Sequence, residues 1–277
     1  MIILDNHLHL RRDGRFLEAV KEFQQAGGTH INLCQYPMVQ LVLKEKTYEP
    51  CYQETFSMAE EIRKNTSVKV YCTIGPYPVD YIRLREELGK ETALQIMKKG
   101  MNLAAEYCQQ GKAIAIGEIG RPHFPVSEDI LHESNEILIY GMQQAKDANV
   151  PVVLHTESTT PEQCKELANM GAQIGLPAHQ IVKHFAPPLI FEHENHGLMP
   201  SVLASKKNSM EAIQKGTRFL METDYIDDPR RPGAVLSPKT VPKRIKELLR
   251  QEHITEEEVG IIHKDNPEKT YHITLEE

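Results

Sequence analysis

The chain opens with the sequence Met1-Ile2-Ile3-Leu4-Asp5-Asn6-His7-Leu8-His9, in which an apolar run leads to two histidines separated by one residue. Alternate side chains of a β-strand point to the same face, so His7 and His9 can enter one pocket where a strand ends. Two imidazoles with a shared direction supply half of a transition-metal site. Taken alone, the pattern is equally compatible with two polar residues at a junction between a strand and a loop.

Four later segments repeat this arrangement, in which a short apolar run leads to one side chain that can bind a metal. The residues at the ends of these runs are Glu118, His155, His184 and Asp224. Each run is short and apolar enough for a buried strand. One such residue is more often an ordinary polar residue at a strand end than a ligand. Six ligand-type residues on five strand ends, however, predict a shared metal site.

Helical sequence separates these runs. Residues 14–26 carry apolar side chains at helical spacing and are followed by Gly27-Gly28, a typical helix stop. The stretch Thr160-Pro161-Glu162-Gln163 combines an N-cap threonine, a proline at the first helical position and a glutamine three residues after the cap. Asn208 to Glu211 repeats this capping pattern. Further helices are expected over residues 52–65, 91–110 and 134–148.

Strand-like segments alternate with these helices along the whole chain. Three further strands are expected at residues 30–34, 68–74 and 199–204, which brings the predicted total to eight. Strands separated by helices form a parallel sheet, and eight such units are typical of a closed (β/α)8 TIM barrel. We therefore predict an α/β fold of this type.

A closed barrel explains why every candidate ligand follows a strand. The active site of such a barrel lies at the C-terminal ends of its strands, where side chains converge from the rim. Closure also places the first strand beside the last. It therefore brings His7 and His9 next to Asp224, although more than two hundred residues separate them in the sequence.

Length and composition limit the alternatives. The 277 residues carry a net charge of −7, which argues weakly against a broad nucleic-acid-binding face but is compatible with a local basic groove. No apolar stretch approaches the roughly 20 residues that span a bilayer, and no basic region typical of a signal peptide precedes the first strand. Five scattered cysteines without a Cys-x-x-Cys pattern indicate reduced thiols. We expect a cytoplasmic protein with one domain over residues 1–277 and no membrane partner.

The order of the candidate ligands resembles that of the TatD-related hydrolases in the amidohydrolase superfamily, which are TIM barrels of the metal-dependent hydrolase type. The resemblance covers nearly the whole chain. It implies that His7, His9 and Asp224 hold one metal, that His155 and His184 hold a second, and that Glu118 bridges the two. The matching segments are Asp5-Asn6-His7-Leu8-His9, Gly117-Glu118-Ile119-Gly120, Val153-Leu154-His155, His184-Phe185, Glu222-Thr223-Asp224 and Asn266-Pro267-Glu268.

Such a ligand set predicts hydrolysis. Two divalent ions roughly 3.5–4 Å apart can share a water, lower its pKa and stabilise the oxygens of an in-line displacement. Asp224 would take the proton from that water, and Glu118 would offer one oxygen to each ion. These two residues are the predicted catalytic groups. The mixed imidazole and carboxylate ligands leave Zn, Mn, Co, Ni or Mg open as the physiological metal.

The predicted substrate loops depart from the family pattern. Glu118 is followed by Ile119-Gly120-Arg121-Pro122-His123, where typical TatD proteins have Ile-Gly-Leu-Asp. Arg121 and His123 are expected to contact a phosphate or carboxylate of the substrate, although Arg121 could instead pair with an acid at the rim. Arg230, in the proline-rich loop at residues 227–233, is a further candidate for binding substrate anions, with a solvated charge run as the alternative.

The favoured function is therefore a two-metal hydrolase in which the shared water attacks a phosphoester, of a small molecule or of a nucleic acid as in a nuclease. Hydrolysis of an amide, an ester or a lactone is the enzymatic alternative. A non-catalytic metal-binding scaffold is a third hypothesis, and the complete ligand set argues against it. The natural substrate and the oligomeric state stay open.

Overall fold

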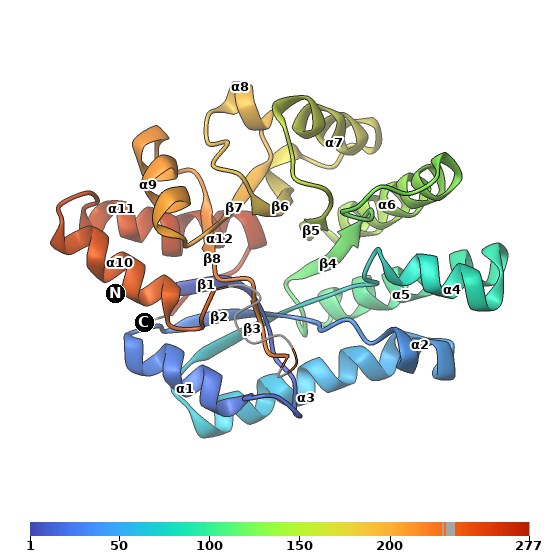
Figure 1. The fold of residues 1–277 in the computed structure, drawn as a ribbon, viewed down its shortest axis with the longest axis horizontal. Helices are drawn as coiled ribbons and strands as arrows, with labels where there is room; N and C mark the ends of the chain where they lie inside the picture. The colour runs from blue at the N-terminus through green and yellow to red at the C-terminus, as the bar shows by residue number, and fades with distance from the viewer. Residues whose placement is uncertain (229, 231–235, 277) are drawn as a thin grey trace.

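The computed structural model describes residues 1–228, 230 and 236–276. Parallel strands lie in the middle of the molecule and helices surround them (Figure 1). Within the described residues, the strands form one sheet in the order β8-β7-β6-β5-β4-β3-β2-β1-β9. Their bounds are β1 Leu4–His9, β2 His30–Cys34, β3 Lys69–Ile74, β4 Ala115–Gly120, β5 Val152–His155, β6 Ile181–Ala186, β7 Met199–Leu203, β8 Leu220–Glu222 and β9 Tyr225–Ile226.

The two ends of the sheet meet and close the barrel. β9 pairs in parallel with β1, with Leu8 opposite Tyr225 and His9 opposite Ile226. Between β8 and β9, the backbone N–H of Asp224 donates to the carbonyl oxygen of His7 at 2.9 Å. The predicted (β/α)8 barrel is therefore confirmed. Its eighth strand is divided into β8 and β9, because Asp224 adopts a left-handed backbone with φ of 48°.

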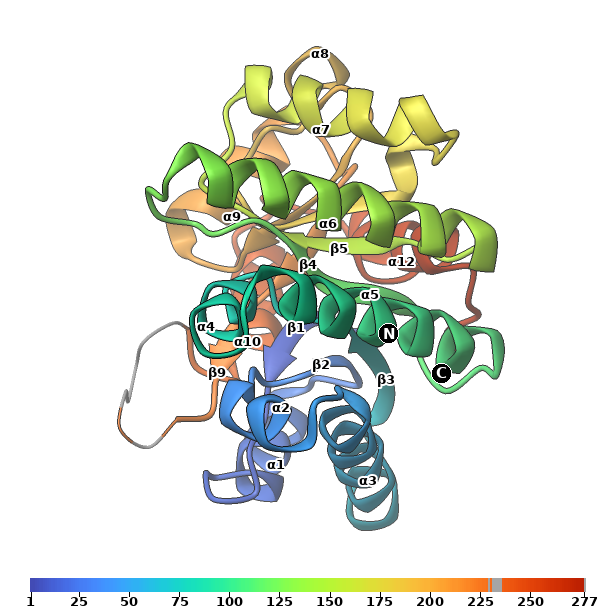
Figure 2. The same cartoon turned by 90° about the vertical axis from the view of Figure 1, so that its right-hand side faces the viewer.

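Helices cover the outside of the barrel, and α5, α6 and α7 lie side by side along one flank (Figure 2). The predicted helices are present, and several helices were not predicted, among them α2, α4 and α10. The bounds are α1 Leu17–Ala26, α2 Val39–Glu45, α3 Glu49–Asn65, α4 Asp80–Leu88, α5 Lys90–Gln109, α6 Glu128–Ala148, α7 Pro161–Ile174, α8 Glu192–Asn195, α9 Lys206–Lys215, α10 Thr240–Arg250, α11 Glu256–Gly260 and α12 Asn266–Tyr271. Short helical turns η1 and η2 occupy Ala178–Gln180 and Ile261–Asp265.

Two helix starts test the capping patterns. The capping box of α7 is confirmed, because the Thr160 side chain accepts from the Gln163 backbone and the Gln163 side chain accepts from the Thr160 backbone. The predicted start at Asn208 is wrong. The helix α9 begins earlier, since the hydroxyl oxygen of Ser205 accepts the N–H of Asn208 at 3.2 Å and so provides the N-cap.

The inside of the barrel is filled by one apolar layer below the candidate site. Ala115, Val153, Val182, Met199 and Leu220 form this buried cluster together with Tyr271 of α12. Burying each of the larger side chains contributes about 1.5–3 kcal/mol relative to leaving it in water. Because strand side chains alternate, the residues two positions after Val153 and Val182 face the same interior. Those residues are His155 and His184, so the packing of the layer aims them into the barrel.

Two findings on the described residues concern the cysteines and the length of the apolar helices. All five cysteines are free and buried, in agreement with reduced thiols. In the same part of the chain, no helix is both long enough and apolar enough to cross a membrane.

Candidate metal centre

Glu118 lies at the centre of the predicted ligands. Its Oε1 atom lies 3.0 Å from Nδ1 of His155 and 3.0 Å from Nε2 of His184. Its Oε2 atom lies 3.3 Å from Nε2 of His9. The two carboxylate oxygens therefore face different imidazoles, which is the arrangement that a bridging ligand needs.

His7, His9 and Asp224 form a second group on the side of the barrel where the sheet closes. The Nε2 atoms of His7 and His9 lie 3.1 Å apart. The Asp224 Oδ1 atom lies 3.9 Å from Nε2 of His7 and 4.0 Å from Nε2 of His9. The structure thus brings all six predicted ligand residues together from five strand ends.

The donor set fits divalent transition metals. Among the described residues, two triplets have ligand atoms within 4.8 Å of one another: His7, His9 and Asp224, and His7, Glu118 and His184. Imidazole nitrogens and carboxylate oxygens are the ligands that Zn, Mn, Co and Ni accept. The first triplet coincides with the first ion site that the family resemblance implies. In the second, His7 takes the place of His155.

Three of the four histidines turn Nε2 toward the centre because the core holds their other nitrogen. The Nδ1 atom of His7 lies 3.2 Å from Sγ of Cys34. The Nδ1 atom of His9 lies 3.1 Å from the carbonyl oxygens of Cys34 and Gln35. Such outer contacts fix the tautomer and the orientation of a metal-binding imidazole.

Glu222 holds the third of these rings and was not predicted as a site residue. Its Oε1 atom accepts from Nδ1 of His184 at 3.1 Å and from the backbone N–H of Phe185 at 2.7 Å. Its other oxygen accepts from the Ser201 hydroxyl. A signal was available, because Glu222 precedes Asp224 by two residues, the spacing that puts two strand side chains on one face.

Asp5 is a second residue that the sequence analysis missed. It is fully buried and accepts from the backbone N–H of Thr223 at 2.9 Å and from its hydroxyl at 2.6 Å. Burial raises the pKa of Asp5 to about 7. This carboxyl group joins β1 to the residue before Asp224, and so it positions one ligand-bearing segment against another.

The electrostatics of the centre favour a positive charge. Burial lowers the pKa of His184, but the carboxylates of Glu222 and Glu118 outweigh burial and raise it to about 10. Burial also acts to raise the pKa of Glu118, yet His184, His7 and His155 together hold it well below its usual range. Glu118 is therefore ionised at neutral pH, as a bridging ligand must be.

Asp224 differs from Glu118 in its protonation. Burial raises the pKa of Asp224 to about 7, against the opposing effect of His184 and His9. A carboxyl group with a pKa near neutrality can both accept and release a proton in that range. A divalent cation beside it would favour the carboxylate form.

Arg121 is committed to two acids rather than open to a substrate. Its Nε and Nη2 atoms donate to the carboxylate of Glu157 at 3.0 and 2.6 Å. Its Nη1 atom donates to Oε1 of Glu166 at 2.8 Å. The side chain is also buried. This is the arrangement named above as the alternative for Arg121.

His123 and Arg230 lie differently with respect to the ligands. The Nδ1 atom of His123 lies 2.8 Å from Nε2 of His155, so His123 contacts one of the candidate ligands from its outer side. Arg230 is exposed and pairs with Asp228, with Nε 3.1 Å from Oδ1. Asp228 also lies 3.3 Å from Nη1 of Arg11. Residues 229 and 231–233 of the proposed loop lie outside the described residues.

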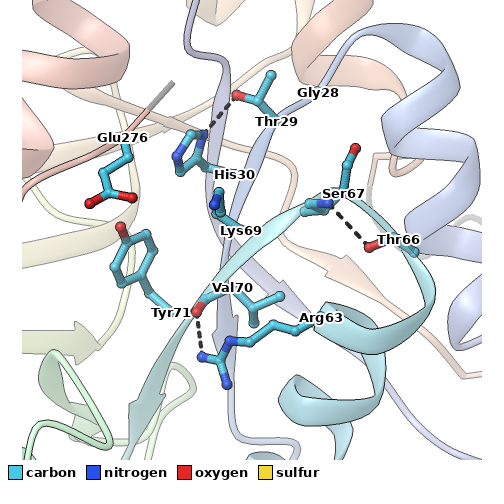
Figure 3. A pocket seen from close by; sticks show the side chains of 11 residues that line it. Gly28, Thr29, His30, Arg63, Thr66, Ser67, Lys69, Val70, Tyr71 and Glu276 are labelled. Atoms are coloured by element: carbon cyan, nitrogen blue, oxygen red, sulfur yellow. Dashed lines mark hydrogen bonds between the residues drawn. The ribbon is translucent and has the colours of Figure 1, made fainter.

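A separate cavity of about 750 Å³ lies at the other end of the barrel, where β2 and β3 begin (Figure 3). His30, Arg63, Lys69, Tyr71 and Glu276 are among the residues that line it. In this fold the N-terminal ends of the strands serve stability, whereas the C-terminal ends carry the chemistry. The cavity is therefore not part of the candidate centre.

A closed parallel barrel with histidines and carboxylates at the C-terminal ends of its strands is typical of metal-dependent hydrolases. Residues 4–272 match the family model described as TatD related DNase. The chain belongs to this family.

A relative of similar length and solved structures with a similar fold also match the chain. The uncharacterized protein MJ1127 of Methanocaldococcus jannaschii is 38% identical over 281 residues, which span 99% of this chain and 97% of that protein. A mutant PTE-like lactonase from Deinococcus radiodurans has a similar fold, with a TM-score of 0.67, 16% identity, and coverage of 97% of this chain and 95% of that one. A TatD family hydrolase from Entamoeba histolytica has a TM-score of 0.60, 15% identity, and coverage of 98% and 99%.

Proposed function

We propose that this chain is a two-metal hydrolase in which water attacks a phosphoester bond. The observation that carries the proposal is the position of Glu118, whose Oε1 faces His155 and His184 while its Oε2 faces His9. A carboxylate with imidazoles against both of its oxygens is suited to joining two cations. The family is described as TatD related DNase, and a DNase cleaves phosphoester bonds, so the family supports a phosphoester as the bond that is attacked.

In this proposal, His7, His9 and Asp224 hold one ion, and His155 and His184 hold the other with Glu118 between them. Two divalent ions, when bound, supply a water of lowered pKa and stabilise negative charge on the reacting oxygens. Asp224 takes the proton of the attacking water, because of the two candidate ligand carboxyl groups, Asp224 and Glu118, it is Asp224 whose pKa burial raises to about 7. Glu222 orients His184, and Asp5 holds Thr223, the residue before Asp224, against β1.

We further propose a small substrate in preference to a nucleic acid strand. Binding a strand requires cations that are free to neutralise phosphates. Three of the arginines in the loops after β1, β4 and β9 are already paired: Arg11 with Asp13 and Asp228, Arg121 with Glu157 and Glu166, and Arg230 with Asp228. These three arginines are therefore not free partners for a long row of phosphates.

A carboxylic ester or lactone is the second candidate substrate. A cavity of about 410 Å³ lies beside His123, and Phe124 and Leu131 contribute to its apolar wall. Both side chains are partly exposed, so they are accessible to a ligand in this cavity. The similar fold of the lactonase from Deinococcus radiodurans also supports this alternative.

The test compares substrates on protein of known metal content. The chain is stripped with a chelator and reloaded separately with Zn, Mn, Co, Ni and Mg, and bound metal is counted. Turnover is then measured with bis-p-nitrophenyl phosphate, p-nitrophenyl acetate, a γ-lactone and single-stranded DNA. We expect two ions per chain and faster turnover of the phosphodiester than of DNA.

The outcomes separate the hypotheses. One ion per chain at saturation would contradict the two-metal mechanism. Faster turnover of the acetate or the lactone would favour the second candidate. A fully loaded protein that hydrolyses none of the four substrates would favour a non-catalytic scaffold.

A further inference from the structure

We propose that Tyr77 and His123 are positioning residues, which hold the ring of His155 from the rim of the barrel so that its Nδ1 atom faces Glu118. The proposal rests on the metal centre proposed above. It gives a structural role to the loops after β3 and β4, which carry Tyr77 and His123 and contribute no candidate ligand.

The contacts of His155 run in two directions. Its Nδ1 atom lies 3.0 Å from Oε1 of Glu118. On the other side of the ring, its Nε2 atom lies 2.8 Å from Nδ1 of His123 and 3.2 Å from the hydroxyl oxygen of Tyr77. The rings of His123 and Tyr77 each stand edge-on to the ring of His155, with centroids 4.9 Å apart in both pairs.

This orientation is the reverse of that of the other three histidines. His7, His9 and His184 turn Nε2 toward the centre, and the core holds their Nδ1 atoms through Cys34, Gln35 and Glu222. The His155 side chain is 17% exposed, against 0% for His7 and 4% for His184. His155 is therefore the ligand whose outer nitrogen reaches the rim, where Tyr77 and His123 hold it.

The chemistry of imidazole makes these contacts important. A neutral histidine that binds a cation through Nδ1 carries its proton on Nε2. That N–H needs an acceptor, and both the His123 Nδ1 atom and the Tyr77 hydroxyl oxygen lie within hydrogen-bond distance. Loss of such an outer partner typically weakens metal binding by about 10–100-fold.

The proposal predicts that the two ions respond differently to changes at the rim. The ion held by His155 and His184 depends on Tyr77 and His123. The ion held by His7, His9 and Asp224 does not, because Cys34 and Gln35 fix the two imidazoles of that group.

The test uses the full chain with Tyr77→Phe, with His123→Ala and with both changes. Tyr36→Phe is the matched control, because Tyr36 is also a rim tyrosine, but its ring stands edge-on to His9. Metal-free proteins are titrated with Mn²⁺ by calorimetry. We expect one of two binding steps to lose roughly 10-fold in affinity in each single variant and up to roughly 100-fold in the double variant. The other step, and both steps of the control, should match the wild type.

A second measurement does not depend on the number of ions. In a crystal structure of the metal-free double variant, we expect the His155 ring to turn so that its Nδ1 atom leaves Glu118. The His123→Asn variant should keep the ring in place, because the amide oxygen of asparagine can accept the Nε2 proton of His155. A ring that stays against Glu118 in the double variant overturns the proposal. Wild-type protein that binds a single ion contradicts the two-metal mechanism instead, and the ring position still decides this inference.

Discussion

The carboxylate of Glu222 reaches from β8 past β7 to His184 on β6, where its Oε1 atom accepts a hydrogen bond from Nδ1 at 3.1 Å. The opposite nitrogen of the same ring lies 3.0 Å from Glu118. His184 is thus fixed between two carboxylates, one behind it and one at the centre.

Glu222→Ala should weaken the binding of one ion by about 10–100-fold, because His184 loses the acceptor that orients it. Glu222→Gln should lose less, since the amide oxygen can still accept from Nδ1. Metal titration of the three proteins, with circular dichroism to check folding, measures the effect. Equal metal affinity in all three would show that Glu222 does not act through His184.

Asp224→Asn should retain much of the bound metal and lose turnover. The amide keeps an oxygen for the ion but cannot accept the proton of the attacking water, and general base catalysis typically contributes about 10²–10⁴-fold. Metal content and kcat on bis-p-nitrophenyl phosphate are measured on the same preparation. A kcat equal to that of the wild type would remove Asp224 from this role.

His263 should make stability depend on pH. It is buried against Leu4, with Nδ1 3.0 Å from the Leu4 carbonyl oxygen, and burial lowers its pKa from 6.5 to about 4. The unfolded chain therefore binds the proton first as pH falls, so the stabilisation present above pH 6.5 is lost progressively down to about pH 4.

The expected loss across this window is roughly 3 kcal/mol. The His263→Gln variant should not show this loss of stability, because glutamine does not titrate. The difference in unfolding free energy between wild type and variant should therefore shrink as pH falls from 6.5 to 4. Urea denaturation of metal-free protein at several pH values provides the measurement. A difference that stays constant would mean that His263 titrates alike in both states.

Ser205→Ala should lower stability by about 1 kcal/mol, because the first turn of α9 loses the side chain that caps it. Asn208→Ala is the matched control. Asn208 lies inside the first turn, where alanine is the better helix former, so the substitution should be neutral or slightly stabilising. The two variants are compared by thermal unfolding, and a larger loss for Asn208→Ala would restore the helix start that the sequence favoured.

The barrel and the convergence of the six candidate residues could be predicted because they depend on local patterns. The short apolar runs that lead to His155, His184 and Asp224 indicate where strands end. In a parallel barrel, such strand ends lie at one rim. The predicted metal ligands therefore needed no knowledge of how the loops pack.

Other features depend on contacts between distant segments. The pairing of Arg121 with Glu157 and Glu166 requires the loop after β4 to meet α7 and the segment before it. The role of Tyr77 is visible only once the loop after β3 lies beside His155. The left-handed backbone of Asp224, which divides the last strand, has no glycine to mark it.

Closure of the barrel between β1 and the segment around Asp224 also determines when the centre can form during synthesis. A ribosome produces His7 and His9 well before Asp224, which lies more than two hundred residues later in the sequence. A nascent chain that has not yet reached Asp224 therefore cannot bring all six candidate residues together.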